Sequence, residues 1–328
     1  MNDKNWTLPL AGLLIVALMA GLAFGPYPLS AGQIIAELTG QGSEPAASIV
    51  FWKIRLPRVI AAALVGAALA AAGAAYQSAF RNPLVSPDIL GVSSGAGLGA
   101  VLGIYLGLPV LAIQLIGFGF GLATVALVVA LAAAIRGPVL VMVLCGIALG
   151  ALAGAGISMI KLLADPDNQL PAITFWLMGS LAGAKGGDVA AAAPAILVGI
   201  LPLILLRWRI GLLALGEDEA RSLGVNAARL RAVVVAGATL MTSAAVAMAG
   251  VIGRVGLMVP HMIRQLTGPR FDRLLPASIL GGAAFMVLVD TLARTMARQE
   301  IPLGILTAVL GAPIFILLLA KSASQWRA

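Results

Sequence analysis

Long apolar runs without a charged residue are the feature that most limits how this 328-residue chain can fold. Eight such runs follow one another: Asn5–Ala36, Val59–Phe80, Ile89–Ile135, Gly137–Ile160, Val189–Leu206, Ala232–Gly253, Leu274–Val289 and Ile301–Ala320. A helix needs about 20 apolar residues to cross a bilayer. Only 10% of the residues are charged and 61% are hydrophobic, too few charges to cover a soluble domain. We therefore predict an all-α, polytopic membrane protein.

The number of spans depends on three stretches. The run from Ile89 is long enough for two spans, with a predicted break at Gly107-Leu108-Pro109. This gives nine spans. Asn168–Ala184 is apolar but interrupted by Pro171 and Gly179, so whether it re-enters the membrane is open. Val255–Leu266 is short, and counting it as a span gives about ten, with both termini on one side.

Small residues fill the predicted spans. Ala61–Ala75 is largely alanine and glycine, and Gly146, Gly150 and Gly154 repeat at four-residue spacing. Such faces let membrane helices pack closely. We expect one compact transmembrane domain over residues 1–328. Leu8–Phe24 resembles a signal peptide, but with many spans downstream an uncleaved first span is favoured.

The basic residues indicate the orientation. Placing the N-terminus, the C-terminus and residues 214–231 in the cytoplasm assigns 13 of the 21 Lys and Arg residues to the inner side. The excess is small but has the sign of the positive-inside rule. The remaining basic residues, including Arg254, are predicted to lie on the outer side, which calls for a reason.

The longest polar interruption is Leu215–Arg231, between the sixth and seventh spans. Acids in its first turn and Gly224 as a stop predict one short helix, and Asn226 can cap a second helix that enters the next span. Ala220 and Leu223 would share one face, surrounded by charge. We interpret this as a docking surface for another protein. The alternative is a solvated loop.

Four motifs occur in order from about residue 50 to the C-terminus. They are Arg55-Leu-Pro-Arg58, Arg81-Asn-Pro-Leu-Val-Ser-Pro-Asp-Ile-Leu-Gly-Val-Ser-Ser-Gly-Ala-Gly97, Gly216-Glu-Asp-Glu-Ala-Arg-Ser-Leu-Gly224, and Val259-Pro-His261 with Ile301-Pro-Leu-Gly304 and Leu310-Gly-Ala-Pro313. Each motif is weak alone, but the ordered set resembles the FecCD family. These proteins are permease subunits of type II ABC importers for iron–siderophore complexes, haem and vitamin B12.

The resemblance implies a ten-helix subunit in the inner membrane that pairs with a second copy or a close paralogue. Two ATPase subunits would bind on the cytoplasmic side, and a soluble substrate-binding protein would dock outside. The chain lacks an ATPase motif, since no Ser or Thr follows the lysine of Ala184-Lys185-Gly186. We therefore expect no cofactor in this chain, with ATP and Mg bound by the partner ATPases. Lipid is an expected partner, and nucleic acid is not.

The resemblance also assigns residues. The ATPase-coupling helix of the family matches Gly216, Glu217, Asp218, Glu219, Ala220, Arg221, Leu223 and Gly224. Docking positions for the binding protein match Arg55, Arg58 and Arg294, which we expect to point outward. A guanidinium fork suits carboxylates of such a partner. The alternative role of these arginines is anchoring to lipid phosphates.

The segment with Asn82, Pro83, Pro87 and Asp88 is predicted to form a cytoplasmic turn, with Ser86 or Asp88 as a helix cap. A role in the ATPase contact or inner gate is the alternative. One departure from the family is the loop Arg136-Gly-Pro-Val-Leu140. The vitamin B12 importer carries small hydroxyl residues there, and this chain carries none.

Other candidate residues favour structural roles. His261 is the only histidine and Cys145 the only cysteine, so no metal site is expected. Asp290 is an intramembrane acid and hence a functional candidate, but Arg294 four residues later makes a structural pair equally plausible. Gly95-Ala-Gly97-Leu-Gly99 lacks the strand of a dinucleotide site, which favours helix packing.

The expected function is that of a permease that carries a metal chelate, a ferric siderophore above all, into the cytoplasm. Haem, vitamin B12 or an oxyanion are alternative substrates. An ion-driven secondary transporter is the rival class, which predicts paired ionisable residues or broken helices at mid-membrane. A membrane enzyme would need a catalytic cluster of polar groups. The sequence does not identify the chelate or distinguish a homodimer from a paralogue pair.

Overall fold

The computed structural model describes residues 6–326 apart from 43 and 138, and every regular element in that part of the chain is helical. The elements are α1 (Thr7–Ala23), α2 (Ala31–Leu38), α3 (Pro45–Ile49), η1 (Val50–Arg55), α4 (Leu56–Ala79), η2 (Pro87–Leu90), α5 (Val92–Tyr105), α6 (Val110–Ile135), α7 (Val139–Leu163), α8 (Gln169–Leu177), α9 (Gly186–Leu205), α10 (Arg207–Leu212), α11 (Glu217–Ser222), α12 (Ala227–Ala249), α13 (Val255–Thr267), α14 (Phe271–Ala293) and α15 (Leu303–Trp326). The predicted all-α class is confirmed. Lys4 and Arg327 of the charge count, and the side chain of Glu217, lie outside what the structure describes.

Six helical segments of the described chain are long and apolar enough to cross a membrane: Pro45–Ala79, α6, α7, α9, α12 and α14. The first is continuous through α3, the π-helical η1 and α4. Three shorter apolar helices, Thr7–Ala23, Val92–Tyr105 and Leu303–Ile316, match further predicted spans. The multi-pass architecture is confirmed, whereas the count of ten spans stays a prediction.

The predicted break within the run from Ile89 is present. Helix α5 ends at Tyr105 and α6 begins at Val110. Gly107 has a positive φ of 66°, a conformation that glycine adopts at little cost, and Pro109 precedes α6 in an extended conformation. Two antiparallel helices therefore form from one apolar run.

Two of the ambiguous stretches are short helices. At about 1.5 Å per residue, the nine residues of α8 extend roughly 14 Å and the 13 residues of α13 roughly 20 Å. Both are shorter than a hydrocarbon core of about 30 Å. Residues 250–254, between α12 and α13, form no helix. The return passage after α12 is therefore discontinuous, with a non-helical segment followed by a short helix.

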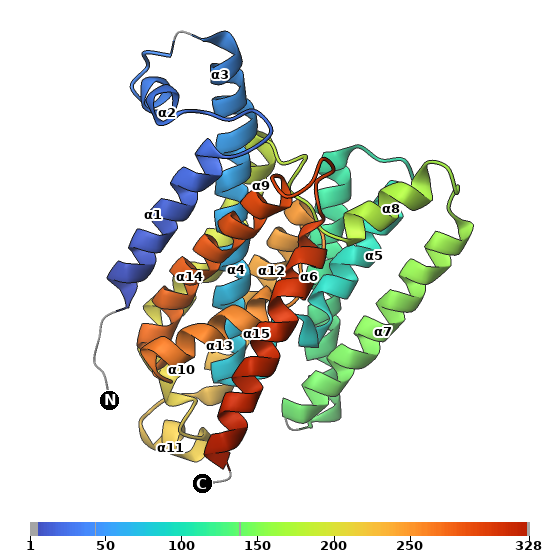
Figure 1. Cartoon of the computed structure of the whole chain (residues 1–328). Helices are drawn as coiled ribbons and strands as arrows, with labels where there is room; N and C mark the ends of the chain where they lie inside the picture. Colours follow the sequence, from blue (N-terminus) through green and yellow to red (C-terminus); the bar gives the residue numbers. More distant parts are fainter. Residues whose placement is uncertain (1–5, 43, 138, 327–328) are drawn as a thin grey trace.

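The two ends of the bundle differ (Figure 1). Helix α15 ends near α11, and the first residues of α1 face the same way; we name this the α11 end. Helices α2, α3 and α8 lie at the opposite end, which we name the α2 end. The described chain thus starts and finishes at the same end, as an even number of passages requires.

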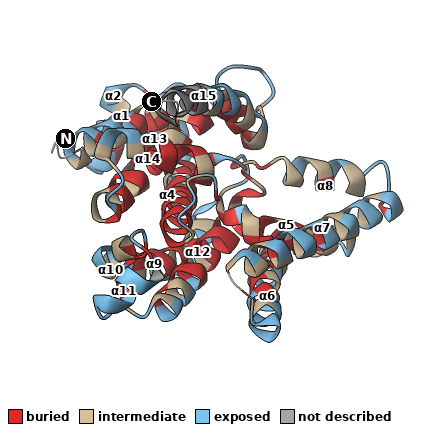
Figure 2. Ribbon diagram, turned by 90° about the horizontal axis from the view of Figure 1, so that it is seen from below, coloured by how far each residue is buried: buried red, intermediate tan, exposed pale blue. Residues whose placement is uncertain are grey.

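Helix α4 is the centre of the fold, and it is buried along most of its length (Figure 2). Its small residues bring other helices to backbone contact. A Cβ added at Gly66 would lie 2.1 Å from the carbonyl oxygen of Gly282 in α14, and one at Gly73 would lie 1.7 Å from that of Gly256 in α13. Close approach through small residues is how helices associate where lipid supplies no hydrophobic drive.

Helices α6 and α7 lie at the periphery and are mostly exposed or half-buried (Figure 2), and many of their exposed residues are large and apolar. Leu115, Leu152 and Leu162 are among them. In a membrane these surfaces contact lipid or another membrane protein rather than water.

Candidate coupling and docking sites

The polar segment between α9 and α12 forms a compact platform at the α11 end. After α10, the chain makes the six-residue helix α11, which starts after Gly216 at a φ of 136° and is followed by Gly224 at a φ of 77°. Both glycines occupy backbone conformations that side chains disfavour. Asn226 then accepts a hydrogen bond through Oδ1 from the backbone N of Arg229, at 3.0 Å. The predicted short helix, glycine stop and Asn226 cap are confirmed.

The exposed surface of α11 is charged. Asp218 and Arg221 project outward and form a loose pair, with Nη1 of Arg221 3.8 Å from Oδ1 of Asp218. Ala220 is fully buried, whereas Leu223 is 58% exposed. The expectation that Ala220 and Leu223 share one outward face is therefore wrong, because Ala220 packs onto the bundle and holds α11 in place.

The turn after α4 has the expected extended entry and a short 3₁₀ helix, η2. Oδ1 of Asn82 accepts a hydrogen bond from the backbone N of Leu84 at 2.9 Å, which closes an Asx turn. Ser86 is the N-cap residue of η2, one of the two predicted positions, but its side chain makes no capping hydrogen bond, and Asp88 accepts from the hydroxyl of Ser93. The carboxylate thus ties η2 to the first turn of α5.

Two arginines hold the end of α1. The guanidinium of Arg55 donates to the carbonyl oxygens of Leu22, Ala23 (2.8 Å) and Tyr27. Arg294, from α14, donates to the carbonyl oxygen of Gly21. The last carbonyls of a helix have no partner within the helix, so these two side chains satisfy them at the α2 end.

Arg58 is the hub of a buried ion-pair cluster. Its Nε lies 3.0 Å from Oδ1 of Asp290, and its Nη1 lies 2.8 Å from Oε1 of Glu300. Asp290 is also 3.6 Å from Nε of Arg294. The predicted pairing of Asp290 with Arg294 is confirmed, and Arg58 and Glu300 extend it.

Burial corrects the predicted orientation of the three arginines. Arg55, Arg58 and Arg294 are only 2%, 6% and 5% exposed. They do lie near the α2 end, but carbonyl and carboxylate partners within the chain draw their side chains inward. In this conformation they do not point outward.

Glu300 is the member of this cluster that sequence reasoning missed. It is 242 residues from Arg58 and has no local spacing that would signal the pair. The pairing of Asp290, by contrast, could be predicted from its four-residue spacing to Arg294. His261 is buried, and both of its ring nitrogens lack a hydrogen-bond partner among the described residues.

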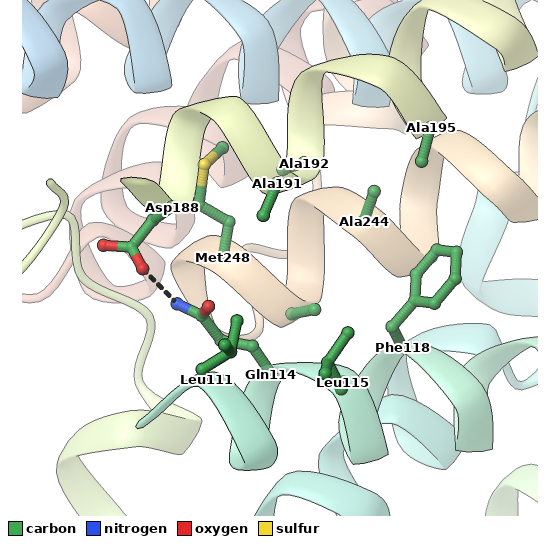
Figure 3. A pocket seen from close by; sticks show the side chains of 11 residues that line it. Leu111, Gln114, Leu115, Phe118, Asp188, Ala191, Ala192, Ala195, Ala244 and Met248 are labelled. Atoms are coloured by element: carbon green, nitrogen blue, oxygen red, sulfur yellow. Dashed lines mark hydrogen bonds between the residues drawn. The ribbon is translucent and has the colours of Figure 1, made fainter. Parts of the chain in front are cut away.

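An apolar hollow lies between α6, α9 and α12 (Figure 3). It is lined by Leu111, Gln114, Leu115, Phe118, Asp188, Ala191, Ala192, Ala195, Ala244, Ala247 and Met248. Nε2 of Gln114 donates to Oδ1 of Asp188 at 3.1 Å across its mouth. Asp188 also accepts from the backbone N of Lys185, so it is occupied as a helix cap. Nothing in this hollow forms a nucleophile–base arrangement.

Taken together, these features define a class. An all-helical bundle with membrane-length helices, a polar platform at one end and a braced opposite end is a multi-pass membrane permease fold. The chain belongs to the FecCD transport family, whose family model matches residues 13–321.

Relatives span nearly the whole chain. It is 39% identical over 316 residues to the molybdate import system permease protein MolB of Haemophilus influenzae, covering 94% of this chain and 93% of that protein. It is 42% identical over 275 residues to an iron chelatin transport system permease protein of Helicobacter pylori, covering 84% and 83%.

Solved structures agree on the fold. A metal-chelate type ABC transporter in an inward-facing conformation superposes with a TM-score of 0.89 at 38% identity, over 96% of this chain and 98% of that one. The PsaBC structure from Streptococcus pneumoniae gives a TM-score of 0.59 at 16% identity, over 87% and 95%, and shares the fold alone.

Proposed function

We propose that this chain is the permease subunit of an ABC importer that carries a ferric chelate of the siderophore type into the cytoplasm. The superposition on a metal-chelate type ABC transporter at 38% identity is the observation that carries this proposal. The iron chelatin permease relative supports the same substrate class. An oxyanion is the second candidate, because the molybdate permease relative is similar over 94% of the chain.

The energy would come from outside the chain. We propose that two ATPase subunits, which bind ATP and Mg, dock at the α11 end and that α11 is the coupling helix. The charged, exposed Asp218 and Arg221 offer polar contacts, while the buried Ala220 ties α11 to the bundle. Movement imposed on α11 would therefore reach α12, which begins five residues after α11 ends.

We place the α11 end in the cytoplasm of an inner-membrane protein, with both termini on that side. The support is the concentration of basic residues there: Arg207, Arg209, Arg221, Arg229, Arg264, Arg270 and Arg273. The exposed apolar faces of the peripheral helices suit lipid and a second copy of the chain, which would complete a central pathway.

A soluble binding protein would then dock at the α2 end. Arg58 and Arg294 can reach carboxylates of such a partner only by leaving Asp290 and Glu300, so we propose that docking exchanges one set of acids for another. Glu300 is the more accessible of the two internal acids, with its side chain 33% exposed against 1% for Asp290.

The ion-driven transporter remains the rival class, since the discontinuous passage at α13 is also a feature of that class. Affinity capture after gentle detergent extraction distinguishes the two. We expect an ATPase subunit to copurify in near-equal amount. Recovery of the chain alone, in several detergents and with nucleotide present, would contradict the importer.

A further inference from the structure

Arg254 combines three unusual properties. It is the N-cap residue of α13, it has a left-handed backbone (φ 69°, ψ −21°), and its side chain is exposed. Left-handed conformations are uncommon for residues other than glycine and are often retained for function. The other such residues, Arg81 and Arg136, follow the ends of α4 and α6, where this conformation commonly terminates a helix.

Contacts with α15 show how far along the bundle axis Arg254 lies. A Cβ added at Gly311 would lie 3.7 Å from both Cβ and Cδ of Arg254. Gly311 is eight residues beyond the start of α15 at Leu303, or about 12 Å along the helix. The backbone N of Leu303 donates to the carbonyl oxygen of Gly179 at 2.9 Å, next to α8 at the α2 end. Arg254 therefore lies about 12 Å along α15 from the first residue of that helix.

Contacts with α4 give the distance from the other end. A Cβ added at Gly256, two residues after Arg254, would lie 2.8 Å from the carbonyl oxygen of Leu69. Leu69 precedes the end of α4 at Ala79 by ten residues, or about 15 Å. Arg254 therefore lies between the two ends of the helical bundle rather than at either of them.

A charge at this depth needs water or a counterion, because hydrocarbon solvates it poorly. Arg58 and Arg294 meet this need with Asp290 and Glu300. The side chain of Arg254 has no ion-pair or hydrogen-bond partner among the described residues. It also sits at the start of a helix, where the backbone dipole is positive and disfavours a cation. The positive charge on this face is therefore uncompensated within the chain.

We propose that Arg254 faces the translocation path at mid-membrane and favours anionic cargo there, namely metal chelates with carboxylate-like donors or oxyanions. This inference rests on the proposed importer function and narrows its substrate class. The guanidinium fork binds carboxylates and oxyanions well. A single exposed cation offers a contact that releases readily.

Thiol modification of the full chain in nanodiscs, with any subunits that copurify, tests this without knowledge of the substrate. In a Cys145→Ala background, cysteine is placed at Ala308 or Ala312, one turn before and one residue after Gly311. The rates of modification by an anionic (sulfonatoethyl) and a cationic (trimethylammonioethyl) methanethiosulfonate are compared. With Arg254 present, we expect the anionic reagent to be favoured by roughly three- to tenfold relative to Arg254→Gln.

Two variants control the measurement. Arg254→Lys keeps the charge and should keep the preference, while Arg298→Gln removes an exposed arginine outside the helices and should leave it unchanged. An equal preference in the Arg254→Gln variant would overturn the proposal. So would cysteines at both positions that react with neither reagent, because the face would then be closed to water. Neither result bears on ATPase copurification, so failure of the importer function is recognised separately.

Discussion

Arg58 and Asp290 are 232 residues apart in sequence, yet Nη2 of Arg58 lies 2.9 Å from Oδ1 of Asp290 in the interior of the bundle. The pair joins α4 to α14, the two helices that also meet at Gly66 and Gly282. The ion pair and the close approach of the two glycines thus hold α4 against α14 at two places along their length.

Asp290→Asn should destabilise the protein by about 3 kcal/mol, because removing one member of a buried ion pair leaves the other charge uncompensated. Reversible unfolding in mixed detergent micelles measures the change. Arg221→Gln is the control: its pair with Asp218 is exposed, and we expect a change of less than about 0.5 kcal/mol. Equal effects of the two substitutions would show that the buried cluster contributes no more to the free energy of unfolding than the exposed pair does.

Gly66→Ala should cost about 3 kcal/mol, since the new methyl group would overlap the backbone of Gly282 and separate α4 from α14. Gly119→Ala in α6 is the matched control, because a Cβ added there meets nothing within 4 Å. The thermal unfolding midpoint of each purified variant is the measurement. A stable Gly66→Ala protein would mean that α4 and α14 can slide apart at little cost.

Replacing Glu217, Asp218 and Glu219 together by alanine should weaken association with the ATPase by roughly tenfold or more, because the exposed carboxylates of Asp218 and Glu219 belong to the charged surface proposed for coupling. The amount of ATPase that copurifies is the readout. Asp165→Ala, at an exposed position between α7 and α8 near the α2 end, removes an acid far from that surface. Undiminished copurification of the triple variant would refute α11 as the coupling helix.

Glu300→Gln should tighten docking of the binding protein by roughly three- to tenfold, since Arg58 would lose its more accessible internal acid and become available to a partner. Affinity for the immobilised permease complex measures this. Unchanged affinity in a folded variant would place docking elsewhere on the α2 end.

A reporter fused after Arg229 should signal the cytoplasm, and one fused after Asp165 should signal the exterior, because these positions lie at opposite ends of the bundle. A phosphatase reporter is inactive in the cytoplasm and active outside the cell membrane, so its activity distinguishes the two compartments. The reverse pattern would invert the proposed orientation and remove the basis for coupling at α11.

Local signals predicted much of this fold. Charge-free runs located the helices, and the break at Gly107 and the cap at Asn226 depend on neighbours within a few residues. The buried cluster could not be predicted in the same way. Glu300 reaches Arg58 only after α4 and α14 have packed, and no sequence spacing encodes that contact.

The depth that we propose for Arg254 could not be predicted from the sequence for a related reason. Its place between two apolar runs indicated a surface residue, because a loop between spans is ordinarily at the surface. The chain is not helical over residues 250–254, before α13 begins. A non-helical segment inside a bundle leaves no periodic pattern to detect. Arg55 was misjudged similarly, since its partners are carbonyl groups that any sequence possesses.

The capping of α1 has a consequence for synthesis of the chain. Its terminal carbonyls are held by Arg55, made soon after α1, and by Arg294, which lies in the last eighth of the chain. Until translation reaches Arg294 and α14 enters the membrane, the Gly21 carbonyl has no guanidinium to accept from. Helix α1 is thus synthesised first, but the hydrogen bonds at its end are among the last to form. A product truncated before Arg294 would lack the guanidinium that the Gly21 carbonyl accepts from.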